Sequence, residues 1–168
     1  RIQGRLLTML ELCDLDASHL SIVTRWPKLD DGGLDLLRVW LDDHPGARCI
    51  AIDTFAKIRP QQDRHSNPYD QDYQAMASIK ELSDERSISI DVVHHTRKML
   101  SDDIFEMVSG TTGLTGAVDT TLVLVKKRGE GDGTLHITGR DVEDQQLAVR
   151  FDKSSCHWSL LGQAVEIQ

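Results

Sequence analysis

The stretch Arg48-Cys49-Ile50-Ala51-Ile52-Asp53-Thr54-Phe55 decides the fold of this 168-residue chain. An apolar run rich in β-branched residues ends there on a carboxylate, and a hydroxyl group follows it. Such runs are typical of strands buried on both faces of a parallel sheet. Because α/β sheets place ligands at the carboxyl ends of their strands, Asp53 is a candidate for holding magnesium beside nucleotide phosphates. The alternative is that Asp53 caps a following helix.

Helices and strands alternate from the start of the chain to residue 95. Apolar spacing predicts helices over residues 1–13, 34–41 and 70–85. Besides the run that ends at Asp53, strands are predicted over residues 20–24 and 87–95. This alternation is typical of right-handed βαβ units in a parallel sheet. Further strands are predicted beyond the glycine-rich stretch 96–116, as an antiparallel meander after the first of them: 120–125, 134–138, 147–151 and 157–161.

Composition restricts the classes of function. The net charge of −8 argues against a broadly basic nucleic-acid surface, so any such binding is expected from local loops. The three cysteines form no CxxC pair, which favours a reduced, cytoplasmic setting over a zinc site or a disulfide framework. No apolar run approaches the ~20 residues of a membrane span, and nothing resembles a signal peptide, so we expect no membrane contact.

The chain contains no GxxxxGK[ST] loop to cradle phosphates. It also opens with residues that read as the interior of an amphipathic helix. We therefore expect the chain to be a fragment of a longer protein.

Four segments, in order, resemble a known family. They are residues 49–60 (CIAIDTFAKIRP), 92–98 (VVHHTRK), 110–120 (GTTGLTGAVDT) and 138–148 (TGRDVEDQQLA). Together they resemble the C-terminal two-thirds of a RecA-like ATPase core, closest to the RepA-like family of plasmid and phage replicative helicases. The spacing of several segments in order is specific, whereas any one alone would be weak.

The resemblance implies a single RecA-like α/β domain, truncated at its N-terminus. A mostly parallel twisted sheet would be flanked by helices, with antiparallel strands at the C-terminal end. Residues 1–47 would form a helix, a strand and a helix, residues 48–128 the Walker B, sensor and DNA-loop core, and residues 129–168 the antiparallel strands. The family's phosphate-binding loop and water-polarising glutamate would both precede Arg1, so we expect the chain alone to be inactive.

The resemblance also implies a site for ATP and Mg²⁺. Asp53 corresponds to the Walker B carboxylate that organises magnesium, and Thr54 to a group that supports the ion's water shell or simply caps the strand. A polar residue after the next strand touches the γ-phosphate in such proteins, which makes His94 and His95 sensor candidates. Alternation along a strand separates the two histidines, and His94 is preferred. The alternative is a pair of satisfied histidines near the sheet end.

Residues 97–116 correspond to the family's DNA-facing loop. The resemblance implies that Arg97, Lys98, Ser109 and Thr111 contact single-stranded DNA through side chains and backbone amides. Three acidic residues in the same stretch weaken its positive potential, so an ordinary surface loop is the alternative.

A basic cluster closes the predicted strand 120–125. In ring ATPases a cation at this place reaches the neighbouring subunit's nucleotide as an arginine finger. Arg128 is the first candidate and Arg140 the second, with Lys127 as a further nucleotide-binding residue. This implies a homo-oligomer, a hexameric ring in the full-length protein, whereas a solvated turn is the plain alternative.

Three functions compete at this point. The leading hypothesis is the motor domain of a replicative DNA helicase. The second is a non-catalytic assembly module derived from such an ATPase, so enzymatic activity stays undecided from the sequence. The third, a metal-dependent hydrolase built on His94, His95 and Asp53, is weaker because adjacent histidines on a strand diverge.

Overall fold

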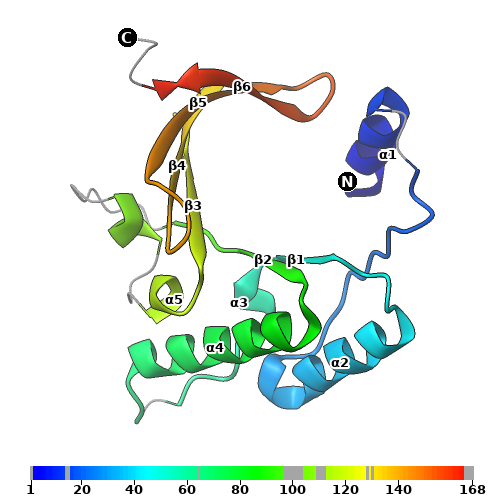
Figure 1. Ribbon diagram of the computed structural model, residues 1–168, viewed down its shortest axis with the longest axis vertical. Helices are drawn as coiled ribbons and strands as arrows, with labels where there is room; N and C mark the ends of the chain where they lie inside the picture. The colour runs from blue at the N-terminus through cyan, green and yellow to red at the C-terminus, as the bar shows by residue number, and fades with distance from the viewer. Residues whose placement is uncertain are drawn as a thin grey trace. The chain divides into compact units, whose positions relative to one another are not determined.

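The computed structural model describes residues 2–13, 16–63, 65–96, 104–108, 113–127, 129 and 131–164 (Figure 1). The chain divides into two compact units, Thr24–Thr121 and the combination of Arg1–Val23 with Leu122–Gln168. The elements in chain order are α1 (Ile2–Cys13), the π-helical turn η1 (Leu29–Gly33), α2 (Leu34–Asp43), β1 (Cys49–Asp53), α3 (Phe55–Ile58), α4 (Pro68–Arg86), β2 (Ser89–Val93), the 3-10 turn η2 (Ile104–Met107), α5 (Gly113–Gly116), β3 (Thr120–Val125), β4 (Asp132–Gly139), β5 (Gln145–Asp152) and β6 (His157–Gln163).

Strands β1 and β2 form a two-stranded parallel sheet in the unit Thr24–Thr121. Their register runs from Cys49 opposite Ser89 to Asp53 opposite Val93. Parallel neighbours need a long crossover, which α3 and α4 supply here. Half-buried and exposed residues alternate along both strands, so the described residues cover only one face of this sheet. The sequence predicted burial on both faces, and the difference arises because Cys49, Ala51 and Asp53 point to the exposed side.

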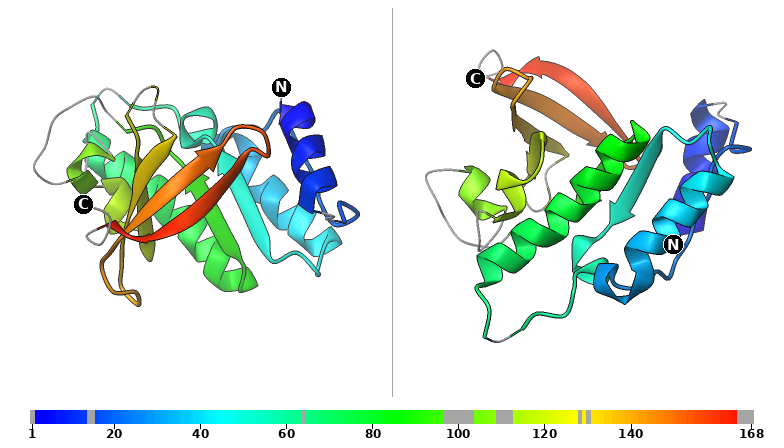
Figure 2. Two further views of the ribbon diagram at one scale, coloured as in Figure 1. Left: turned by 90° about the horizontal axis from the view of Figure 1, so that it is seen from above. Right: turned by 60° about the horizontal axis from the view of Figure 1, so that its bottom comes forward.

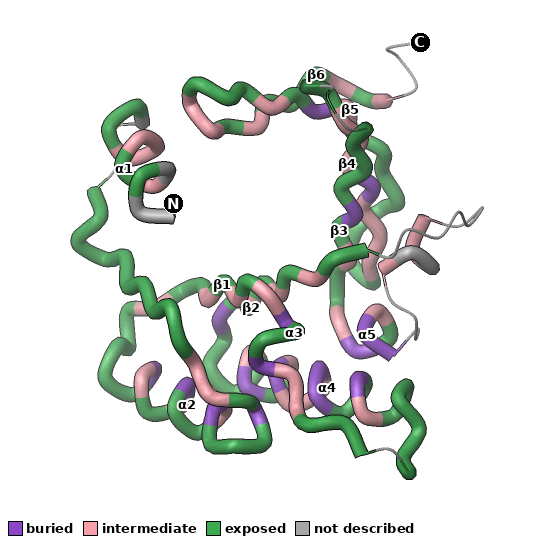
Figure 3. The backbone as a smooth tube through the Cα atoms, turned by 180° about the vertical axis from the view of Figure 1, so that it is seen from behind, coloured by how far each residue is buried: buried purple, intermediate pink, exposed green. Residues whose placement is uncertain are grey.

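Helices pack on the covered face. Ile50 and Ile90 contact a cluster of Leu37 and Leu41 from α2 with Leu82 from α4. A second cluster joins buried residues of α3, α4 and α5 to the half-buried strand residues, and its buried members are Leu29, Phe55, Ile58, Ala75, Met76, Ile79, Leu114 and Ala117. In Figure 3 the buried residues gather on the side of α4 that faces these partners.

Helix α4 confirms the helix predicted over residues 70–85 and begins two residues earlier, at Pro68. Asn67 caps it by accepting a hydrogen bond from the Tyr69 amide at 3.0 Å, and Pro68 occupies its first turn. Its buried residues are Asp72, Ala75, Met76, Ile79 and Leu82. Tyr73, on the same helix, is 42% exposed. The buried face of α4 includes the carboxylate of Asp72 instead.

The structure differs from the prediction at residues 20–24, which form no strand. Leu20, Ile22 and Val23 are 47%, 48% and 60% exposed. A strand needs a neighbouring backbone for its hydrogen bonds, and among the described residues β1 pairs only with β2. Apolar composition alone therefore does not make this segment a strand.

The second compact unit contains an antiparallel sheet in the order β3-β4-β5-β6, which confirms the predicted meander (Figure 2). Leu135 lies opposite Leu147, and Phe151 lies opposite Trp158. The Lys126 ammonium lies 5.3 Å from the Phe151 ring centre and 5.5 Å from that of Trp158. The mixed α/β class is therefore confirmed: the described residues form a two-stranded parallel sheet and a four-stranded sheet in which the β4–β5 and β5–β6 pairs are antiparallel.

A close approach between α5 and α4 yields the first test of this fold. A Cβ atom on Gly113 would lie 2.6 Å from the Tyr69 carbonyl oxygen, whereas a Cβ atom on Gly46 would meet nothing within 4 Å. We expect Gly113→Ala to destabilise the chain by about 1–3 kcal/mol, because backbone must move to admit the methyl group. The matched Gly46→Ala variant should stay within about 0.5 kcal/mol of the original chain. Urea unfolding measures both, and equal midpoints would contradict the packing of α5 on α4.

Candidate functional site

The candidate site lies at the carboxyl end of the β1–β2 pair. Asp53 is the last residue of β1, and its register partner is Val93, the last residue of β2. His94 and His95 follow directly. The parallel register thus brings Asp53 and the two histidines, which are far apart in the sequence, to one edge of the sheet.

The Asp53 side chain is exposed and available for a ligand. Thr54, not Asp53, occupies the N-cap position of α3, and its side chain makes no capping hydrogen bond. No described residue forms a hydrogen bond or ion pair with the Asp53 carboxylate. The alternative that Asp53 is a helix cap is therefore wrong.

The two histidines differ in their surroundings. His94 is half-buried, and its ring meets the ring of Phe55 edge-on, with centres 6.3 Å apart and planes at 73°. Phe55 itself is 1% exposed, which gives His94 a fixed neighbour. His95 is exposed. Which of the two touches a phosphate stays a prediction.

The exposed face of the sheet also carries a thiol, at Cys49 at the start of β1, and a carboxylate, at Asp91 opposite Ala51. The Cys49 thiol donates to Asp91 Oδ2 at 3.5 Å, and the Ser89 hydroxyl donates to Asp91 Oδ1 at 3.3 Å. Burial, and then the negative charge of Asp91, raise the pKa of the Cys49 thiol. Because the thiolate is the nucleophilic form, Cys49 is a poor nucleophile in this position.

An ion pair that the sequence analysis missed braces the other end of α3. Arg59 follows α3 and donates from Nε to Asp72 Oδ1 at 2.7 Å. Asp72 lies on the buried face of α4 and is 4% exposed. The signal for it was present in the sequence, because position 72 belongs to the same helical stripe as Ala75, Met76 and Ile79.

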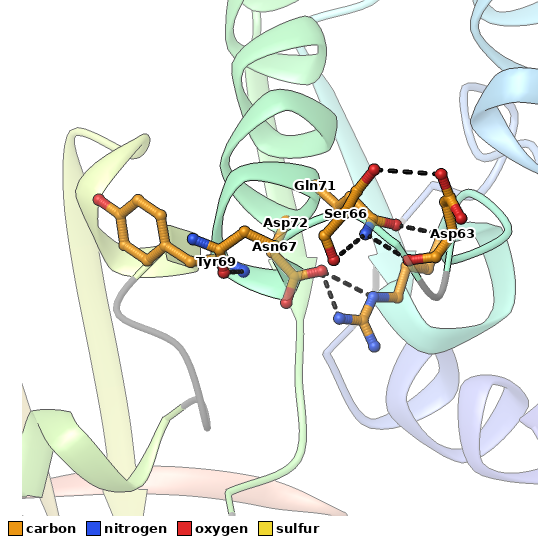
Figure 4. Close-up of polar contacts among 7 residues, drawn as sticks. Asp63, Ser66, Asn67, Tyr69, Gln71 and Asp72 are labelled. Atoms are coloured by element: carbon orange, nitrogen blue, oxygen red, sulfur yellow. Dashed lines mark hydrogen bonds and ion pairs between the residues drawn. The ribbon is translucent and has the colours of Figure 1, made fainter.

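The loop between α3 and α4 is held by a network of hydrogen bonds (Figure 4). The Gln71 side chain accepts from the Asp63 amide at 2.9 Å and donates to the Asp63 and Ser66 carbonyls at 3.0 and 3.1 Å. Asp30 of η1 accepts from the Gln61 amide at 3.1 Å. The loop that follows the candidate site is therefore tied to both η1 and α4.

Other predicted site residues lie elsewhere or outside the described residues. Lys127 and Arg140 are exposed and belong to the compact unit that contains the antiparallel sheet. Arg140 also takes part in an interaction of its own. The remaining candidates lie outside the described residues: Arg97, Lys98, Ser109, Thr111 and Arg128.

The donor set at the sheet edge fits magnesium. The described residues contain no group of three or more His, Cys, Asp or Glu side chains arranged for a metal ion. Magnesium in phosphoryl-transfer sites keeps several waters and needs only one or two carboxylates besides the substrate phosphates. A single exposed carboxylate with a neighbouring hydroxyl, as Asp53 and Thr54 provide, suits this mode of binding.

Comparison with solved structures identifies the fold. The chain is similar to a solved ATPase domain, with a TM-score of 0.63 and 15% identity over 76% of this chain and 50% of that one. It is also similar to a DnaB-like replicative helicase, described together with its interactions with primase. There the TM-score is 0.61 and the identity 13%, over 92% of this chain and 46% of the other. The chain therefore shares the mixed α/β fold of these two solved structures.

At this level of identity the likeness is one of fold, and the chain spans about half the length of each of these two structures. No protein-family model matches the sequence, and no curated protein matches it either. Among the described residues, no helix combines the length and apolar character needed to cross a membrane.

Proposed function

We propose that this chain forms part of the ATP-hydrolysing motor domain of a RepA-like replicative DNA helicase. The observation that carries the proposal is the exposed Asp53 carboxylate at the end of β1, beside the histidines that follow β2, in the fold of replicative-helicase ATPase domains. RecA-like sheets bind nucleotides at this edge. The cytoplasmic setting stays a prediction from the cysteine content.

Each residue has a defined task in this proposal. Asp53 would hold Mg²⁺ through its water shell, with Thr54 beside it, and the ion when bound neutralises charge on the phosphates of ATP. His94 or His95 donates a hydrogen bond to a phosphate oxygen and so senses whether the γ-phosphate is present. In the family that the sequence resembles, a phosphate-binding loop and a water-polarising glutamate act together with these groups.

The DNA-facing residues and the finger complete the proposal. Arg97, Lys98, Ser109 and Thr111 contact single-stranded DNA. Arg128, or else Arg140, reaches the nucleotide of the neighbouring subunit in a hexameric ring, and Lys127 supports the phosphates from the same strand end. The fold likeness does not reach these residues individually. Their assignments rest on the sequence resemblance to the RepA-like family.

Turnover measurements test this function against a non-catalytic assembly module. We expect the 168-residue chain alone to hydrolyse no measurable ATP, and the full-length protein to hydrolyse it in the presence of Mg²⁺ and faster with single-stranded DNA. Full-length protein that binds partners but hydrolyses no ATP would support the assembly module instead. Turnover by the chain alone at ~1–10³ per second, the ordinary range of enzymes, would refute the assignment to a P-loop ATPase family.

A further inference from the structure

The Arg59–Asp72 pair lies at the opposite end of α3 from Asp53, and the proposed function gives it no task. Its carboxylate nevertheless stands out because it is buried. Asp72 is 4% exposed, and no other carboxylate in the described part of the chain is buried. Arg59 donates to it from Nε at 2.7 Å, and a second guanidinium nitrogen lies within ion-pair distance of the same oxygen.

Stability alone does not explain such a pair. Removing two charges from water costs about as much as their attraction returns, and apolar residues of similar volume often stabilise a fold equally well or better. What the pair adds is geometry, because a planar guanidinium on a carboxylate allows few orientations. The role of the pair therefore depends on which parts of the structure it holds in place.

The pair fixes the position of α3. Arg59 is the residue after this one-turn helix, and its amide donates to the Phe55 carbonyl at 2.8 Å. Phe55 is buried, and its ring meets the ring of His94. Asp53 and Thr54 lie immediately before Phe55. One short segment thus links the buried carboxylate of α4 to Asp53 through the chain and to His94 through the ring of Phe55.

Further contacts hold Arg59 on its outer side. In the amide orientation that satisfies both groups, the Gln62 side-chain oxygen accepts from Arg59 Nη1 at 3.3 Å. A nearby backbone amide, that of Gln61, is held by Asp30 at 3.1 Å. The guanidinium therefore lies between a buried partner on α4 and an anchored loop.

We propose that Arg59 and Asp72 are positioning residues of the nucleotide site. The pair clamps α3 against α4 and thereby fixes the Asp53 carboxylate relative to the His94 ring. Neither residue touches the nucleotide. This inference rests on the proposed function, because it takes Asp53 as the carboxylate that organises magnesium.

Binding of Mn²⁺ to the full-length protein, measured by electron paramagnetic resonance with a non-hydrolysable ATP analogue, tests the inference without turnover. Two variants separate position from stability. Asp72→Asn leaves Arg59 without its counter-charge, and Arg59→Met combined with Asp72→Leu replaces the pair by apolar groups. We expect both variants to weaken Mn²⁺ binding about 10-fold. This is the lower end of the affinity loss seen when a group that orients a metal ligand, without touching the metal, is replaced.

Thermal unfolding of the same variants supplies the contrast. Asp72→Asn should unfold at a lower temperature than wild type, whereas the apolar double variant should recover most of that loss. If the pair only stabilised the fold, the double variant would also recover wild-type Mn²⁺ binding, and this result would overturn the inference. Arg59→Lys keeps the charge without the planar fork, so it should fold and weaken Mn²⁺ binding to a smaller extent. Unaltered binding in folded Arg59→Lys would count equally against the inference.

A second ion pair on α4 offers a matched control. Arg86 contacts Asp42 of α2 at 2.6 Å, with side chains 33% and 59% exposed. Replacing Asp42 by Leu and Arg86 by Met should leave Mn²⁺ binding unchanged, since this pair joins α4 to α2 rather than to α3. A loss equal to that of the Arg59 and Asp72 variants would overturn the inference. If Asp53→Asn binds Mn²⁺ as tightly as wild type, Asp53 does not hold the metal. That result would overturn the proposed function, and the inference with it.

Discussion

Full-length protein in which Asp53 is replaced by asparagine is expected to lose ATP hydrolysis by roughly 10²–10³-fold, the usual effect of removing one group that stabilises transition-state charge. The amide keeps the shape of the side chain but removes the charge that holds magnesium. Because the Asp53 carboxylate is exposed and has no described partner, the fold should be unaffected. Steady-state turnover against Mg²⁺ concentration, with thermal unfolding alongside, measures both effects.

Asp91 provides the control for this substitution. It lies on the neighbouring strand and on the same exposed face, but two residues before the strand end. Its carboxylate accepts from Cys49 and Ser89, so it is already engaged within the sheet. Asp91→Asn should keep nearly normal hydrolysis. Equal losses in both variants would mean that the exposed face as a whole matters, and hydrolysis by Asp53→Asn within a few-fold of wild type would remove Asp53 from the metal site.

Local signals in the sequence predicted the elements that hold the site. The apolar run before Asp53 specifies β1 through short-range chemistry, and this strand forms where it was expected. Helix α4 was predicted from its apolar spacing and begins at Pro68, two residues before the predicted start. The edge shared by Asp53 and His94 followed from the βαβ pattern, since parallel strands bring their carboxyl ends together.

Properties that depend on a distant partner were not predictable in the same way. Residues 20–24 have strand-like composition, but no described strand pairs with them. Burial on both faces of β1 was expected from the apolar run alone, whereas the structure covers one face. The Arg59–Asp72 pair joins two elements across a loop, so the sequence showed only half of it, a charged residue on an apolar helical stripe.

The second large effect is expected between subunits. If Arg128 is a finger, it acts on the nucleotide of a neighbouring subunit, so its loss should impair a ring without affecting its own site. Full-length Arg128→Ala and Asp53→Asn proteins should each be inactive alone. Mixed, they should regain part of the activity, because an intact site can then face an intact Arg128 across an interface. Such a finger commonly contributes ~10³–10⁵-fold in rate, so even a minority of repaired interfaces is measurable.

The mixing experiment depends on exchange of subunits, which labelled proteins can establish beforehand. When exchange is confirmed and the mixture stays as inactive as its components, Arg128 does not act in trans. Arg140, which follows β4 and is exposed, is then the next residue to test in the same mixture. Restored activity with Arg140→Ala would move the finger from the end of β3 to the end of β4. Failure of both would leave the cluster after β3 as a solvated turn and would argue against a ring in which neighbours complete each site.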